Sequence, residues 1–138
     1  MTDTLILNAK IINQGAIYES DVAITDGKIS KIGKDLSSLS AKKIIDAAGL
    51  HLMPGMIDDQ VHFREPGLTH KGEIATESRA AVAGGITSYM EMPNVNPQTI
   101  TNFLLEEKYE LGAASSAVNY SFYLGATNHN LEEIKKVN

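Results

Sequence analysis

Cysteine is absent from this sequence of 138 residues. Its absence excludes disulfide bonds and thiolate metal sites, and it fits a reducing compartment, so we expect a cytoplasmic protein. Basic clusters are also scarce, because none is longer than the pairs Lys42-Lys43 and Lys135-Lys136. With a formal net charge of -5, the chain has little to attract nucleic acid or an anionic membrane surface.

Long hydrophobic runs are missing as well. No apolar stretch approaches the ~18 residues that a membrane-spanning helix requires. The opening residues Met1-Thr2-Asp3-Thr4 lack the basic segment and apolar core of a secretory leader, so we expect none. The composition is otherwise that of an ordinary globular protein, with 43% hydrophobic and 21% charged residues, and the length suffices for one modest domain.

Residues 1–51 are predicted to form a β-rich domain. Apolar residues alternate with other residues along 5–11, which indicates a strand with one buried face. The dipeptide Asp26-Gly27 separates two further strand-like segments, and it predicts a hairpin because both residues tolerate positive φ. A short strand is expected at 44–46, after a polar loop. The pattern favours a small antiparallel sheet that carries no chemistry of its own.

Residues 52–138 change to a pattern in which strands alternate with helices. Gly84-Gly85 is expected to end the first helix, and Asn96-Pro97 to begin the second, with asparagine as N-cap and proline in the first turn. Asn130 and Glu133 resemble a capping box for the third helix. The predicted order is strand 52–62, helix 70–83, strand 86–92, a helix closed by Gly112, strand 118–124 and a helix from residue 131.

Three successive strand–helix units imply a parallel sheet covered by helices. Helical periodicity can place Ile74, Ala75, Ala81 and Val82 on one face of the first helix, and Ile100, Phe103, Leu104 and Leu111 recur at helical spacing in the second. A complete (β/α)₈ barrel takes about 250 residues. The expected fold class is therefore α/β, namely the incomplete start of a TIM-type barrel after a small β-rich domain. Because three strands leave an open edge and the chain stops at Asn138, we expect a piece of a longer protein.

The segment 54–67, Pro-Gly-Met-Ile-Asp-Asp-Gln-Val-His-Phe-Arg-Glu-Pro-Gly, is the most informative part of the sequence. Alternate side chains of a strand share one face. Burying several polar groups together without partners costs several kcal/mol, so such a face favours an active-site role. Strict alternation puts the polar Asp58, Gln60, His62 and Arg64 on one face and the apolar Ile57, Val61 and Phe63 on the other.

This segment resembles the first barrel strand of the amidohydrolase superfamily, whose hallmark is Asp-x-His-x-His after Pro-Gly. The continuation Phe63-Arg64-Glu65-Pro66-Gly67 narrows the resemblance to the dihydroorotase branch of the cyclic amidohydrolases, of which the chain would be the N-terminal portion. Hydantoinases and allantoinases are similar up to His62 but usually lack the arginine. The segment from Gly84-Gly85-Ile86-Thr87 to Glu91-Met92-Pro93-Asn94 resembles the same branch.

The resemblance implies a role for each matching residue. His62 would be a metal ligand, and Asp58 would orient its neighbours. Arg64 and Asn94 would bind the substrate carboxylate, the arginine through two parallel hydrogen bonds. Gln60 replaces the first histidine of the motif, and its neutral carbonyl is a weaker zinc ligand. This leaves three possibilities open: weak binding of one metal, a single-metal site, or a relative without catalysis.

For the longer protein, the resemblance implies a dihydroorotase that interconverts dihydroorotate and N-carbamoyl-aspartate in pyrimidine biosynthesis. It would use one or two divalent metal ions, zinc foremost. The acid–base aspartate would lie beyond residue 138, so no catalytic residue is expected in this chain, which alone should be inactive. We also expect residues 1–51 to join a composite β-sandwich, and the longer protein to form a homo-oligomer. The alternatives are an allantoinase or hydantoinase, and a non-catalytic scaffold subunit, which Gln60 favours.

Overall fold

The chain folds as two compact units in the computed structural model, which describes residues 1–137. The first unit comprises Met1–Pro54 and the second Gly55–Asn138. His51 and Leu52, at the boundary that the sequence pattern suggests, pair with the sheet of the first unit. Among residues 1–137, no helix is both long and apolar enough to cross a membrane.

The first unit is built on a sheet in which β1 is central. β1 pairs antiparallel with β2, and β2 pairs antiparallel with β3, but β4 and β5 run parallel to β1. The expectation of a purely antiparallel sheet is therefore wrong. The loop after β3 buries Leu36 beside Leu5 and Ala23, which returns the chain across the sheet before β4. The strands are β1 (Thr2–Asn13), β2 (Ala16–Thr25), β3 (Lys28–Gly33), β4 (Ala41–Asp46) and β5 (His51–Leu52).

Two tight turns in the first unit rely on positive φ. Asp26 and Gly27 have φ of 51° and 69°, which confirms the hairpin predicted between β2 and β3. Gln14 and Gly15, with φ of 49° and 75°, make a second turn between β1 and β2. The sequence pattern misses this turn because glutamine is not among the residues favoured at positive φ.

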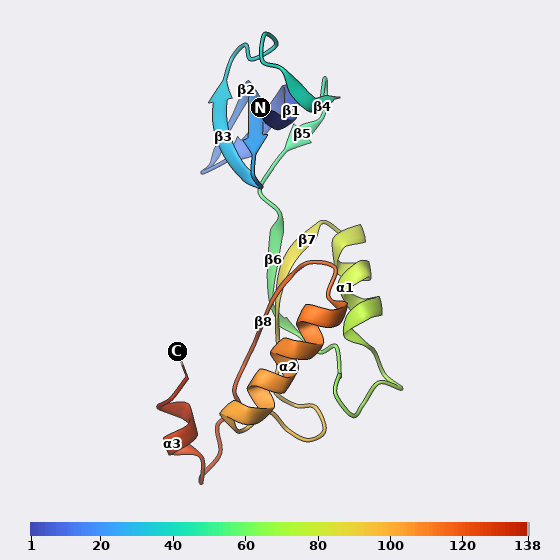
Figure 1. The fold of residues 1–138 in the computed structure, drawn as a ribbon, viewed down its shortest axis with the longest axis vertical. Coiled ribbons are helices and arrows are strands. Elements are labelled where there is room, and N and C mark those ends of the chain that lie inside the picture. The colour runs from blue at the N-terminus through green and yellow to red at the C-terminus, as the bar shows by residue number, and fades with distance from the viewer. Residues whose placement is uncertain (138) are drawn as a thin grey trace. The chain divides into compact units, whose positions relative to one another are not determined.

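The second unit, within residues 55–137, contains a parallel sheet on which α1 and α2 pack from one side (Figure 1). α1 contacts β7, α2 contacts β8, and the two helices contact each other. This arrangement is the opening of a (β/α)₈ barrel, and it confirms the predicted fold class. The elements are β6 (Met56–Val61), α1 (Ile74–Ala83), β7 (Ile86–Glu91), α2 (Asn102–Ser115), β8 (Asn119–Phe122) and α3 (Leu131–Ile134).

The helix ends follow the sequence pattern only in part. Gly84 caps α1 and Gly85 has φ of 89°, as expected for a glycine stop. The predicted start of α2 at Asn96-Pro97 is wrong, because Thr101 is the N-cap and its Oγ1 accepts from Leu104 N at 3.2 Å. Asn96 N instead donates to Pro66 O at 3.1 Å, which ties this segment to the loop after β6.

The buried faces of the helices also differ from the helical pattern. Val82 is 46% exposed and Phe103 is 71% exposed, so neither packs against the sheet. Gly112 does not close α2, which continues to Ser115. A Cβ at Gly112 would lie only 2.7 Å from the Tyr120 ring, so this glycine lets α2 approach β8 closely. The side chains that the helices do bury include Ile74, Ser78, Leu105 and Lys108.

α3 does not carry the predicted capping box. Asn130 makes no side-chain cap to its own helix, because its Oδ1 accepts from Thr127 N at 2.8 Å, and its amide nitrogen donates to Ile100 O and Gly125 O. Glu133 caps a different helix, since its Oε2 accepts from Asn102 N at 2.7 Å. That hydrogen bond lowers the pKa of Glu133 below its ordinary value. The side chains of Asn130 and Glu133 thus bond to other segments and do not cap α3.

Candidate active site

Strand β6 is irregular where it carries the candidate residues. Its pairing with β7 slips between Asp58 and Val61, so β6 holds one residue more than β7 over this interval. Such a bulge interrupts the side-chain alternation. Asp58 Oδ1 accepts from Gln60 N at 3.2 Å within the bulge. Strict alternation from Asp58 to Arg64 is therefore wrong.

After the bulge, successive side chains of the chain alternate between the hydrophobic core and the solvent-exposed face of the sheet. Val61 and Phe63 pack into the core beneath the helices, whereas Gln60 and His62 are exposed. Ile57, before the bulge, is 66% exposed and not packed with them, contrary to the sequence pattern. The polar face of β6 is thus shorter than strict alternation predicts, and it consists of the residues next to the carboxyl end of the strand.

His62 and Asn94 meet at the carboxyl ends of two neighbouring parallel strands. His62 Nδ1 lies 2.9 Å from Asn94 Oδ1. An amide oxygen can only accept, so Nδ1 is the donor in this bond, and in the neutral tautomer that makes it Nε2 carries the lone pair. The bond uses the oxygen of Asn94, which leaves its amide nitrogen able to donate to a substrate. The structure therefore brings together a predicted metal ligand and a predicted substrate contact.

Arg64 follows β6 in a left-handed backbone conformation. Its φ is 73°, which is uncommon for a residue other than glycine. Its backbone nitrogen donates to Glu91 Oε1 at 2.8 Å, and its side chain is half-buried. Because the strand ends at Val61, a turn and not the strand pleat sets the position of Arg64.

Glu91 belongs to a buried ion pair that the sequence reveals only in part. Its Oε2 lies 2.9 Å from Lys108 Nζ, and the two side chains are 0% and 1% exposed. Burial raises the pKa of Glu91 and lowers the pKa of Lys108 from their ordinary values. A charged residue on a buried strand usually has a charged partner, but the sequence pattern did not identify Lys108 as that partner. The available signal is spacing, since Lys108 follows Leu104 by one helical turn on an otherwise apolar stripe.

The loop after β6 is in direct contact with the loop after β7. Glu65 Oε2 accepts from Ile74 N at 2.9 Å and so caps the start of α1. Gly67 has φ of 78°, and a Cβ there would overlap the Asn96 carbonyl. This close approach keeps the loop that contains Arg64 beside the loop that follows Asn94.

Two adjoining cavities open at the carboxyl end of the sheet. One, of about 450 Å³, is lined by Gln60 and Tyr123, and the other, of about 230 Å³, by Asn94 and Gln98. Both are bordered by Pro93, Gly125 and Ala126. Tyr123 donates from its hydroxyl to Asp59 O at 3.0 Å and lines the larger cavity. No motif or periodicity in the sequence pointed to Tyr123 or Gln98 as residues of this site.

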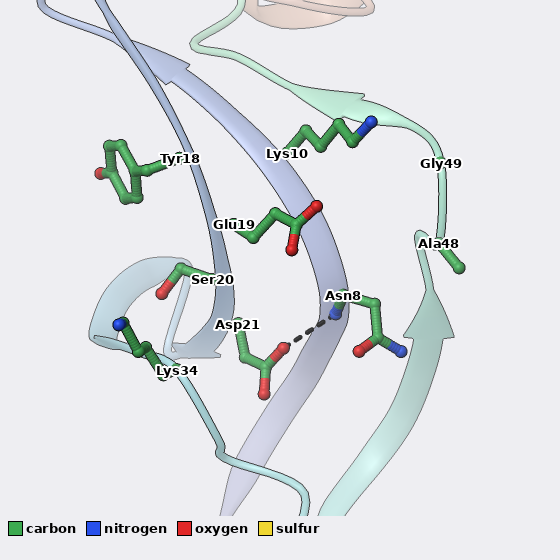
Figure 2. A pocket seen from close by; sticks show the side chains of 9 residues that line it. All are labelled: Asn8, Lys10, Tyr18, Glu19, Ser20, Asp21, Lys34, Ala48 and Gly49. Atoms are coloured by element: carbon green, nitrogen blue, oxygen red, sulfur yellow. Dashed lines mark hydrogen bonds between the residues drawn. The ribbon is translucent and has the colours of Figure 1, made fainter.

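A further cavity, of about 630 Å³, lies in the first unit (Figure 2). Its buried Asp21 accepts from Asn8 N at 2.8 Å and from Leu36 N at 2.9 Å. These bonds hold Asn8, with φ of 56°, in a bulge of β1 and fix the loop after β3. Both oxygens of the Asp21 carboxylate are thus engaged in bonds that hold the backbone, so we do not assign this cavity a binding or catalytic role.

Comparisons with known proteins agree with this geometry. Residues 1–49 match the family model of the urease alpha-subunit N-terminal domain. The chain is 39% identical over 137 residues to a dihydroorotase of Methanosarcina mazei and 36% identical over 136 residues to an allantoinase of Desulfitobacterium hafniense. It superposes on the structure of an L-hydantoinase from Arthrobacter aurescens with a TM-score of 0.96 and 34% identity. The chain matches the N-terminal part of cyclic amidohydrolases.

These matches cover nearly all of this chain but a minor part of each relative. The matched region is 98 to 99% of the chain and 30% of the dihydroorotase, of the allantoinase and of the L-hydantoinase. The chain therefore spans about 30% of the length of the cyclic amidohydrolases that it matches.

The side chains of residues 1–137 can supply only part of a metal site. A zinc site needs three or four protein ligands. Within residues 1–137, no three histidine, aspartate or glutamate side chains gather closely enough to hold a metal ion. His62 Nε2 suits one ligand position, and the Gln60 carbonyl would be a weak second ligand. Further ligands would have to come from outside these residues.

Proposed function

We propose that this chain forms the N-terminal part of a dihydroorotase-like cyclic amide hydrolase. The longer protein, in which residues 1–138 continue into a complete barrel, is called the barrel-complete protein below. It would add water across a ring amide of dihydroorotate to give N-carbamoyl-aspartate, and catalyse the reverse reaction. The observation that supports this proposal is the meeting of His62 and Asn94 at neighbouring strand ends, 2.9 Å apart, where active sites of this fold lie.

His62 would be prepared for metal binding by Asn94. The hydrogen bond from Nδ1 fixes the tautomer and the ring orientation, and it directs the Nε2 lone pair away from Asn94. A divalent metal ion, when bound, would supply polarisation of the amide carbonyl. Gln60, on the wall of the larger cavity, would contribute at most a weak ligand, and Asp58 would support the bulge through its bond to Gln60 N.

Arg64 and Asn94 would select the substrate. Dihydroorotate carries a carboxylate, and a guanidinium binds a carboxylate through two parallel hydrogen bonds. The Asn94 amide nitrogen would add a neutral donor. Together these groups would orient the ring so that its amide faces His62. Hydantoin and allantoin lack a carboxylate, so they would gain little from Arg64.

A hydantoinase or allantoinase is the second candidate. It is favoured by the TM-score of 0.96 to an L-hydantoinase and by 36% identity to an allantoinase. A scaffold subunit without catalysis is the third candidate, because Gln60 stands at the place of a usual histidine ligand.

Replacing Arg64 with glutamine separates these candidates. In the barrel-complete protein, we expect kcat/KM for dihydroorotate to fall about 10- to 100-fold, the loss that removing hydrogen bonds to a charged group produces. Hydrolysis of hydantoin should change less than about twofold, since no carboxylate is bound there. Steady-state kinetics with both substrates measures the two effects.

Arg79, an exposed arginine of α1, provides the matched control. R79Q should leave both activities unchanged. An equal loss for both substrates in R64Q would mean that Arg64 supports the loop and does not select the carboxylate. If the wild-type protein hydrolyses hydantoin or allantoin but not dihydroorotate, the result would favour the second candidate. No turnover and no bound metal would favour the scaffold.

A further inference from the structure

Glu91 joins three parts of the second unit at the end of β7. Its Oε1 accepts from Arg64 N at 2.8 Å, and its Oε2 lies 2.9 Å from Lys108 Nζ on α2. Lys108 Nζ also donates to Met92 O at 3.3 Å and lies 4.8 Å from the centre of the Phe122 ring. The carboxylate thus links a turn of the candidate site to the core below it.

The contact between Glu91 and Arg64 fixes an uncommon backbone. Arg64 has φ of 73°, a region that residues other than glycine seldom occupy without support. A hydrogen bond to a buried carboxylate is stronger than one to a neutral acceptor. Glu91 is 0% exposed, so water does not compete for this bond.

A buried ion pair is not in general required for a stable core. Replacing a buried ion pair by apolar residues of similar size often leaves stability unchanged or improves it. Stability alone therefore does not account for an acceptor directed at Arg64 N. Apolar residues in place of Glu91 and Lys108 could not accept the hydrogen bond from Arg64 N.

We propose that Glu91 is a positioning residue for Arg64. Its buried carboxylate holds the Arg64 backbone in the left-handed conformation, and this conformation directs the guanidinium toward the carboxylate of the substrate. Lys108 keeps the carboxylate charged and in place. The effect on substrate selection rests on the proposed function, whereas the effect on the Arg64 backbone does not.

Two double variants separate the hydrogen bond from the ion pair. E91Q/K108M removes both charges but keeps a carbonyl acceptor for Arg64 N. E91L/K108M removes both charges and the acceptor. Methionine, which is long and flexible, fills the space of the lysine stem against Phe122 in both variants. At the Arg64 amide, the two variants differ in whether the side chain at position 91 can accept its hydrogen bond.

The backbone test uses the 138-residue chain and NMR. In wild type and in E91Q/K108M, we expect the Arg64 amide to be protected from hydrogen exchange and to give the strong intraresidue HN–Hα NOE of a positive φ. In E91L/K108M, its exchange should be about tenfold faster, as the loss of one hydrogen bond predicts, and the NOE should weaken. The Leu105 amide, bonded to Thr101 O within α2, should be equal in all three and serves as the control.

The substrate test uses the barrel-complete protein. E91L/K108M should raise KM for dihydroorotate about tenfold with little change in kcat, and E91Q/K108M should restore KM toward wild type. An E91L/K108M variant whose Arg64 amide exchanges as slowly as in wild type would overturn the proposal. An unprotected Arg64 amide in wild type would also overturn it, and this result does not depend on whether either variant folds. Altered exchange without a change in KM would keep the backbone role and remove the role in selection.

Discussion

Replacing Lys108 with alanine is expected to lower the free energy of unfolding of the second unit by about 3–5 kcal/mol. The substitution leaves the Glu91 carboxylate buried at 0% exposure without its cation, which lies 2.9 Å away in the native chain. It also removes the lysine stem from the Phe122 ring. Urea denaturation of the 138-residue chain, followed by circular dichroism, measures the change.

The control is K71A, which removes an exposed lysine of the same unit and should change stability by less than about 0.5 kcal/mol. The double variant E91L/K108M should recover most of the loss, because it removes the unpaired charge together with its partner. A loss below about 1 kcal/mol in K108A, the range of surface ion pairs, would contradict a buried and desolvated pair.

Replacing His62 with alanine is expected to abolish most of the hydrolase activity of the barrel-complete protein. Loss of a partner that only orients a metal-bound histidine lowers metal affinity or activity by roughly 10- to 100-fold, so loss of the ligand itself should exceed roughly 100-fold. N94A should fall within the smaller range, because it removes the acceptor that lies 2.9 Å from His62 Nδ1. Turnover and bound metal are measured on the same preparations.

His70 is the matched control for His62, since it lies a few residues away and is exposed. H70A should retain activity within about twofold, as expected for a surface substitution without partners in the site. Full activity and full metal content in H62A would contradict the assignment of His62 as a ligand.

Local signals predicted the parts of the fold that depend on a few neighbouring residues. Asp26-Gly27 and Gly84-Gly85 adopt the predicted turn and helix end because only their own backbones decide the outcome. Asn96 and Asn130 were expected to cap helices, yet both form bonds to loops distant in sequence. Several residues near each helix start can act as caps, and tertiary contacts choose among them.

The candidate site was predictable to the extent that the strand is regular. Gln60 and His62 are exposed opposite Val61 and Phe63, as alternation requires. The bulge after Asp58 and the left-handed Arg64 could not be predicted, because they arise from pairing with β7 and from the Glu91 carboxylate.

The most direct test of the account is the substrate preference of the wild-type barrel-complete protein. Its kcat/KM should be measured side by side for dihydroorotate, hydantoin and allantoin, with bound metal quantified in each preparation. We expect dihydroorotate to be preferred at least about tenfold, the advantage that a paired carboxylate gives. A preference for either uncharged ring would contradict it.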